Sequence, residues 1–330
     1  MSNGSTVTEF LLLGFSDVRE LQILHFVVFL AIYLVGLIGN LLIISAVAVN
    51  HHLHTPMYFF LGNLSLLDLS SISVTVPKSM ANSLLDTRVI SYSACVAQVF
   101  LFFIFTSTDL HLLTIMAYDR YVAICHPLHY ERVMNRRVCV FMATGAWLAG
   151  IIYAALHTGN TFRLSFCRAN AIDQFFCEIP QLLKLACSDS YHSEVGVTVF
   201  GAVLAFTCFV FIIVSYVPFG AVLAFTCFVL IIVSYVQIFR AVLRIPSEQG
   251  RHKAFSTCLP HLAVVSLFLS TASFTYLKPT SSAPSGLDLA VGVLYAVVPP
   301  VMNPVLYSLR NRELKAALKK LFGWRLVSKY

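Results

Sequence analysis

Residues 25–49 read HFVVFLAIYLVGLIGNLLIISAVAV, an almost uninterrupted apolar stretch with no Asp, Glu, Lys or Arg. A helix needs about 20 mainly apolar residues to cross the hydrocarbon core of a bilayer, so this stretch is long enough for one crossing. Comparable stretches recur along the chain, and each predicts a membrane-spanning helix. We expect seven crossings, at about 25–49, 57–80, 94–120, 139–158, 195–217, 254–278 and 288–308.

The composition excludes a soluble globular protein. Apolar residues make up 58% of the 330 residues and charged residues only 11%, whereas a soluble domain carries about 25% charged residues. The sequence therefore predicts an all-α membrane protein, a seven-transmembrane helix bundle over residues 25–308. Residues 1–24 are expected to be extracellular, and residues 309–330 are expected to form a cytoplasmic tail.

The positive charges support this orientation. Most of the 22 Lys and Arg residues lie in three clusters, at 120–137, 240–253 and 310–329. With seven crossings, these clusters fall on the second and third cytoplasmic connections and on the tail, as the positive-inside rule requires. The net charge of +7 therefore indicates membrane orientation rather than nucleic-acid binding.

The two ends of the chain carry weaker signals. Asn3 begins the sequon Asn-Gly-Ser, an expected glycosylation site if the N-terminus is lumenal. No cleavable signal peptide is expected, so the first span would serve as its own insertion signal. Residues 310–322 predict a short amphipathic helix along the inner membrane surface. Its apolar face would comprise Leu314, Ala317, Leu318, Leu321 and Phe322.

A tandem duplication interrupts the regular pattern. Residues 200–217 and 219–236 differ only at Phe211 versus Leu230, and Pro218 joins the two copies. One continuous helix through both copies would be about 70 Å long, against a hydrocarbon core of about 30 Å. Two separate spans would fit by length but would move the last two basic clusters outside. We therefore expect one overlong fifth helix, kinked or broken near Pro218.

Polar motifs at the inner ends of the third and seventh spans carry the functional signal. MAYDRYVAICHP at 116–127 places an Asp-Arg pair at the membrane edge, where charged residues are costly and usually functional. PVMNPVLY at 300–307 places Pro inside an apolar helix, where neighbours must satisfy the freed backbone group. Together with HTPMYFFL at 54–61 and KAFSTC at 253–258, these motifs resemble the olfactory receptor family of rhodopsin-like G-protein-coupled receptors. The resemblance covers nearly the whole chain.

The resemblance implies an activation switch at the cytoplasmic end. Arg120 would be held by Asp119 in the resting state and released when span six swings outward, which opens a cleft for the G protein. The residues of this predicted switch are Asp119, Arg120, Tyr121, Asn303, Pro304 and Tyr307.

Two carboxylates are predicted to lie deep in the membrane. Because buried charge is costly, Asp68 and Asp109 are each expected to share a proton, a sodium ion, or amide donors such as Asn40 and Asn303. The resemblance assigns them to a polar core that couples the ligand site to the G-protein site. A catalytic carboxylate pair is the alternative, but no nucleophile, phosphate loop or HExxH motif accompanies it, so we expect no enzyme. Apart from the sodium ion, no cofactor or metal is expected.

Four of the nine cysteines fall on the lumenal side, where oxidation is permitted. Four cysteines allow three pairings, and the resemblance implies Cys95 with Cys177 and Cys167 with Cys187.

The ligand pocket is expected between spans three, five, six and seven, in their outer halves. Aromatic surface mixed with a few hydroxyl groups would suit a small, mostly apolar organic ligand. The expected lining residues are Phe102, Phe103, Thr106, Ser107, Ala272, Ser273, Tyr276 and Tyr295.

These features predict an odorant receptor that binds a small volatile ligand and activates a stimulatory olfactory-type G protein. By resemblance, it would lie in the plasma membrane, in the cilia of olfactory sensory neurons. A non-functional family member or a gene-model artefact is the alternative, because of the duplicated segment. A transporter is less favoured, since the one repeat is direct and short rather than inverted.

Overall fold

The computed structural model describes residues 7–166, 170–187, 219–244, 247–277, 286–310, 314 and 316–318. Within α8 the side chains are described from residue 229 onward, within α9 in part and up to 270, and within α10 from 289 onward.

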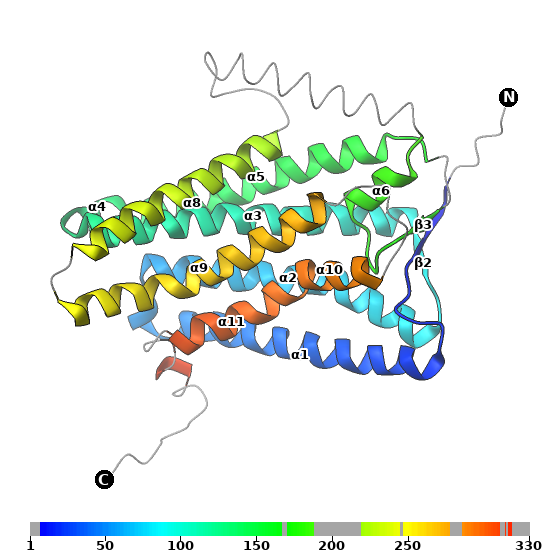
Figure 1. The fold of residues 1–330 in the computed structure, drawn as a ribbon, viewed down its shortest axis with the longest axis horizontal. Helices are drawn as coiled ribbons and strands as arrows, with labels where there is room; N and C mark the ends of the chain where they lie inside the picture. Colours follow the sequence, from blue (N-terminus) through cyan, green and yellow to red (C-terminus); the bar gives the residue numbers. More distant parts are fainter. Residues whose placement is uncertain are drawn as a thin grey trace, which may run out of the picture.

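Long helices running side by side make up the molecule (Figure 1). They are α1 (Arg19–Val49), α2 (Pro56–Leu85), α3 (Tyr92–Cys125), α5 (Arg136–Phe162), α8 (Phe219–Leu243), α9 (Glu248–Leu277), and the consecutive pair α10 (Gly286–Ala296) and α11 (Val298–Arg310). The pair forms the seventh member of the bundle, so the predicted seven-transmembrane fold is confirmed. Within the described ranges, five helical stretches are long and apolar enough to cross a membrane: α1, α2, α3, α5 and 289–307.

The fifth crossing was expected at 195–217, which lies outside the described residues. The helix in the fifth place of the described bundle is α8, which contains the second copy of the duplication, 219–236. Its core residue Ile231 is buried together with Leu112 and Leu113 of α3 and Val264 of α9. The second copy therefore packs into the helix core.

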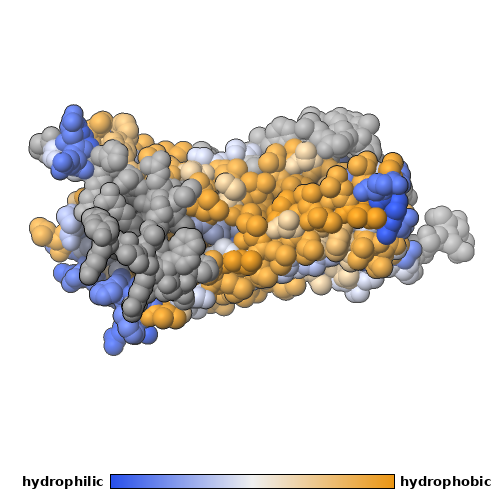
Figure 2. Space-filling view, turned by 90° about the horizontal axis from the view of Figure 1, so that it is seen from below, coloured by the Kyte–Doolittle hydropathy of each residue, from blue (hydrophilic) through white to orange (hydrophobic). Residues whose placement is uncertain are grey.

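The exposed surface agrees with a lipid environment. Figure 2 shows a band of hydrophobic residues across the middle of the visible face, with hydrophilic residues gathered toward its two ends. On α5, for example, Phe141 and Ile152 are 79% and 56% exposed. In water such residues would be unfavourable, whereas in a bilayer they face acyl chains.

Small residues let helices α3 and α5 approach closely. A Cβ atom at Gly150 would lie 3.1 Å from the carbonyl oxygen of Ile104 and 3.2 Å from Oγ of Ser107. Ala143, Ala146 and Ala154 are buried on the same helix. Helix association in membranes depends on such close packing, because lipid removes the usual hydrophobic drive.

Proline in α11 leaves a backbone acceptor that a neighbouring helix satisfies. Pro304 has no N–H to donate to the carbonyl oxygen of Pro300, four residues earlier. Nδ2 of Asn40, on α1, donates to that oxygen at 2.9 Å and to Gly36 at 2.9 Å. The compensation predicted for the PVMNPVLY motif is therefore present, and Asn40 supplies it.

Short elements close the extracellular end. Strand β1 (Glu9–Leu12) pairs antiparallel with β2 (Val89–Ser91) and parallel with β3 (Ala171–Ile172). The N-terminal segment therefore forms the central strand of a small sheet, which the sequence analysis did not predict. Phe10 is fully buried there. Helix α6 (Ile179–Leu185) lies at the same end (Figure 1).

Short helices form the connections from α1 to α2 and from α3 to α5. They comprise η1 (His51–Leu53), η2 (Pro127–His129) and α4 (Tyr130–Val133). Of the predicted tail helix, Leu314 and Ala317 are buried in the same core cluster as Tyr307, and Leu318 packs against it. Leu321 and Phe322 lie outside the described residues.

Candidate functional site

The cytoplasmic end of α3 holds the Asp-Arg pair in a closed arrangement. Oδ2 of the buried Asp119 lies 3.4 Å from Nη2 of Arg120. The hydroxyl of Tyr130, from α4, donates a hydrogen bond to Oδ1 of the same carboxylate at 2.7 Å. Both oxygens of Asp119 are thus engaged. Burial, with the adjacent Asp119 carboxylate, raises the pKa of the Tyr130 phenol, so it remains a donor at physiological pH.

Tyr121, the third residue of the motif, points elsewhere. Its hydroxyl lies 3.0 Å from Nε2 of His126, beyond the end of α3, and its ring packs against Ile238 and Val242 of α8. Tyr121 therefore connects α3 to the fifth helix and does not contribute to the Asp119–Arg120 pair.

The predicted polar core assembles from four helices. Nδ2 of Asn303, on α11, donates to Oδ2 and Oδ1 of Asp68, on α2, at 2.9 and 3.2 Å. Asp109, on α3, is buried and close enough to Asp68 for the two carboxylates to interact electrostatically. Among the described residues, four buried polar atoms of this core have no hydrogen-bond partner: Asn40 Oδ1, Asp109 Oδ1, Asn303 Oδ1 and Tyr307 Oη. Three of these four are acceptors only, which suits a cation, a shared proton or water.

The candidate ligand-binding residues on α3 point in two different directions. Phe102 points toward Tyr295 of α10, with ring centroids 5.7 Å apart. Phe103 packs against Tyr153 and His157 of α5 instead, at 6.1 and 6.2 Å. The four predicted residues of α3 therefore do not share one wall.

The two α3 hydroxyls already donate their protons to the backbone. Oγ1 of Thr106 donates to the carbonyl oxygen of Phe102 at 2.9 Å, and Oγ of Ser107 donates to that of Phe103 at 2.6 Å. Ser107 also lies 3.5 Å from the Gly150 carbonyl oxygen, at the α5 interface. In this arrangement each hydroxyl offers a ligand only its lone pairs. The side chains of Ala272, Ser273 and Tyr276 lie outside the described residues.

On the extracellular side, Cys95 and Cys177 form a disulfide. Cys187 is also disulfide-bonded, but its predicted partner Cys167 lies outside the described residues, as does Asn3.

Residues 29–324 match the family model described as "Olfactory receptor". The chain belongs to the olfactory receptor family. Human olfactory receptor 14A16 is 49% identical over 329 residues, covering 100% of each chain. Human olfactory receptor 14I1 is 51% identical over 322 residues, covering 98% of this chain and 97% of that protein. The crystal structure of squid rhodopsin matches with a TM-score of 0.65 and 18% identity, covering 94% of this chain and 88% of that chain. That likeness shows the fold.

The sequence analysis missed two residues that link the helices of this olfactory receptor. The hydroxyl of Tyr235, on α8, lies 2.6 Å from Nδ1 of the buried His261, on α9. Nε2 of His261 lies 3.0 Å from the carbonyl oxygen of Leu113, on α3. Because a carbonyl oxygen only accepts, Nε2 carries the proton and Nδ1 accepts from Tyr235. A lone histidine within an apolar stretch was the available signal.

A third missed residue lies on the cytoplasmic surface of this receptor. Leu128, in η2, is 95% exposed. It lies two positions before Tyr130, whose hydroxyl donates a hydrogen bond to Asp119.

Proposed function

We propose that this chain is an odorant receptor that binds a small, mostly apolar organic ligand and activates a stimulatory, olfactory-type heterotrimeric G protein. The observation that carries the proposal is the closed contact of Arg120 with Asp119, whose carboxylate also accepts a hydrogen bond from Tyr130. An agonist that binds the open arrangement more tightly would shift the population toward it. The proposed location is the plasma membrane of olfactory cilia.

The ligand class follows from the walls that line the outer half of the bundle. Phe102 and Tyr295 supply aromatic surface, and Thr106 supplies a hydroxyl whose proton is already used. Such a site favours apolar contact, with an acceptor for a ligand that carries a donor such as an alcohol. No residue is proposed to be catalytic.

Coupling to a stimulatory G protein can be tested directly. In cells that lack stimulatory Gα subunits, a panel of volatile alcohols should produce no cyclic AMP through the receptor. Restoring the olfactory-type subunit should restore the response, because the cytoplasmic cleft then has its partner. Restoring an inhibitory subunit is the control and should give no rise. A receptor at the cell surface that stays silent with the olfactory-type subunit would contradict the proposal.

We further propose that the polar core holds a sodium ion in the resting state. Acceptors predominate among its unpartnered atoms, and two carboxylates lie together there. Asp68 and Asp109 would hold the ion, with the unpartnered side-chain oxygen of Asn303 as a neutral ligand. A cation that binds the resting state better than the active state lowers the apparent affinity of an agonist that prefers the active state.

Sodium dependence is the expected consequence. In isolated membranes, replacing sodium by N-methyl-D-glucamine should lower the half-maximal agonist concentration for nucleotide exchange by about fivefold or more. Asp109→Asn should abolish that dependence because it removes a negative ligand. The matched control is Asp86→Asn at the exposed extracellular end of α2, which should retain it. Equal sodium dependence in both variants would exclude the proposed site.

We also propose that the second copy of the duplication forms the fifth span and that the first copy is an insertion preceding it. Tyr235, Ile238 and Val242 of α8 make the contacts with α3 and α9. All three belong to the second copy or to the residues directly after it.

A further inference from the structure

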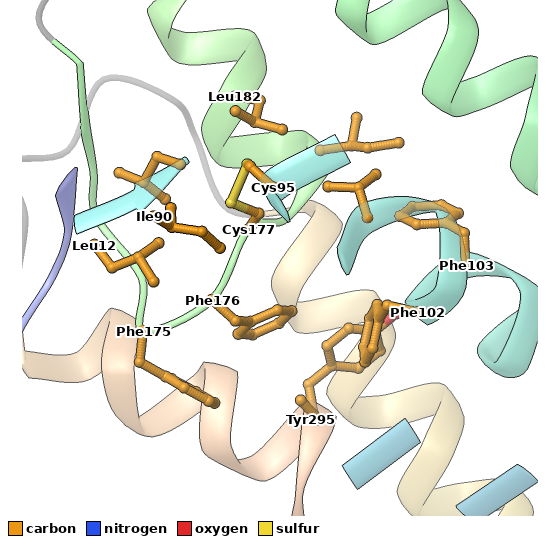
Figure 3. Packing of buried hydrophobic residues seen from close by; sticks show 14 of the residues in the cluster. Leu12, Ile90, Cys95, Phe102, Phe103, Phe175, Phe176, Cys177, Leu182 and Tyr295 are labelled. Atoms are coloured by element: carbon orange, nitrogen blue, oxygen red, sulfur yellow. A yellow bond between two sulfur atoms is a disulfide. The ribbon is translucent and has the colours of Figure 1, made fainter. Parts of the chain in front are cut away.

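Phe175 and Phe176 are adjacent in the loop that precedes the disulfide cysteine Cys177, and both are buried, with 2% and 0% of their surface exposed. Their ring centroids are 4.9 Å apart. Figure 3 shows the two side chains leaving the loop in different directions. Two identical side chains with the same burial therefore contact different parts of the receptor.

The position of this loop is fixed against α3 by two tethers. Cys177 is bonded to Cys95, and its backbone N–H donates to Oε1 of Gln98 at 2.8 Å. Nε2 of Gln98 donates in turn to the carbonyl oxygen of Val74, on α2, at 2.9 Å. Gln98 lies about one helical turn inward from Cys95. The loop is therefore held at a defined depth, and Phe176 is held with it.

Phe176 contacts the predicted ligand-binding region. Its ring centroid lies 5.2 Å from that of Phe102, which in turn lies 5.7 Å from Tyr295. Phe102 is seven residues inward from Cys95 along α3, or about two helical turns. Phe176 therefore lies between the disulfide and Phe102, on the extracellular side of the candidate pocket (Figure 3).

Phe175 faces the N-terminal segment. Its ring centroid lies 5.7 Å from Phe15 and 6.0 Å from Phe29 of α1. It also lines a cavity of about 30 Å³ next to the N-terminal segment. Because one water molecule needs at least about 10–15 Å³, this cavity has room for about two waters and none for an odorant. Phe175 is thus a structural neighbour of Phe176 that does not reach the candidate pocket.

We infer that the Phe176 ring closes the extracellular end of the ligand pocket and limits the length of the ligands that the receptor accepts. This inference rests on the proposed odorant-binding function. A ligand anchored at Thr106 would extend outward along Phe102 and meet the Phe176 ring. The loop tethers keep that ring in place, so a longer ligand cannot push it aside without breaking the Gln98 contact. Ligand length is then set by one aromatic ring of the extracellular loop.

The test uses a homologous series of straight-chain primary alcohols and measures half-maximal concentrations for cyclic AMP production. Phe176→Ala should move the preferred chain length upward by about two methylenes or more. Each additional buried methylene should lower the half-maximal concentration roughly fourfold. Phe176→Leu, which retains apolar packing, should give a smaller shift in the same direction and guards against misfolding of the alanine variant.

Phe175→Ala is the matched control, because it removes the same ring from the same loop at the same burial. It should lower the amount of receptor at the cell surface without changing the preferred chain length. An unchanged preference in both Phe176 variants, or an equal shift in Phe175→Ala, would overturn the inference while leaving the receptor function standing. A wild-type receptor that is silent to the whole series would instead overturn the proposed ligand class, and the inference with it.

Discussion

Arg120→Ala is expected to reduce agonist-driven cyclic AMP production to background while leaving surface expression largely intact. Arg120 is held in the resting state by a 3.4 Å contact with Asp119. In the open state its guanidinium would be free to bind the G protein, as a planar group with five donors. The variant removes this group but leaves the Tyr130 hydrogen bond to Asp119, so the buried carboxylate retains a donor. Cyclic AMP and an N-terminal epitope should be measured on the same cells.

The matched control for this prediction is Arg137→Ala. Arg137 belongs to the same basic cluster, is exposed at the start of α5, and loses the same side chain in the variant. It should signal normally if the defect of Arg120→Ala comes from loss of the switch and not from a general loss of cytoplasmic positive charge. Undiminished signalling by Arg120→Ala at equal surface density would exclude the switch. An equal loss of signalling in both variants would show that the defect is a non-specific effect of lost positive charge.

Deleting residues 200–218 is expected to raise the amount of receptor at the cell surface several-fold. Both copies in one continuous helix would greatly exceed the bilayer thickness, and apolar surface outside the membrane promotes retention and aggregation. Changes of about 1–2 kcal/mol in stability alter cellular abundance several-fold. The residues that tie the fifth helix to its neighbours, including Tyr235, remain in the shortened chain. Flow cytometry of an N-terminal epitope on unpermeabilised cells measures the yield.

The complementary deletion, 218–236, is an internal control for this prediction. It leaves a chain of the same length that differs only by Phe in place of Leu230. Leu230 is 50% exposed on the outer surface of α8, so the larger side chain should be tolerated. Both deletions should therefore give the same yield. A yield equal to or below that of the full chain would show that the bundle accommodates the extra segment.

Most of the architecture could be predicted because hydropathy and charge are local properties. The apolar stretch at 25–49 lies within α1, and the Pro304 motif required the compensation that Asn40 provides. Helix ends were less predictable, since α2 and α3 extend beyond the expected apolar ranges into their polar flanks. The central strand β1 could not be predicted, because its partners β2 and β3 lie far away in the chain.

The candidate sites show the same division. The Asp119–Arg120 pair is visible in the sequence because the two residues are adjacent. The hydrogen bond from Tyr130 and the Tyr235–His261–Leu113 chain are not, because they join segments that meet only in the folded protein. Phe102 and Phe103 could not be separated by pattern alone, since both are apolar residues on an apolar helix.

The sequence alone predicted the seven membrane crossings, the end that faces the cytoplasm, and the residues that form the motifs. Those properties depend on residues close together in the chain and on their transfer from water to lipid. Only the tertiary structure decided which neighbour each side chain meets, because a helix apolar on nearly all sides does not specify its own rotation. Contacts such as Asn303 with Asp68, 235 residues apart, are set by how the helices pack.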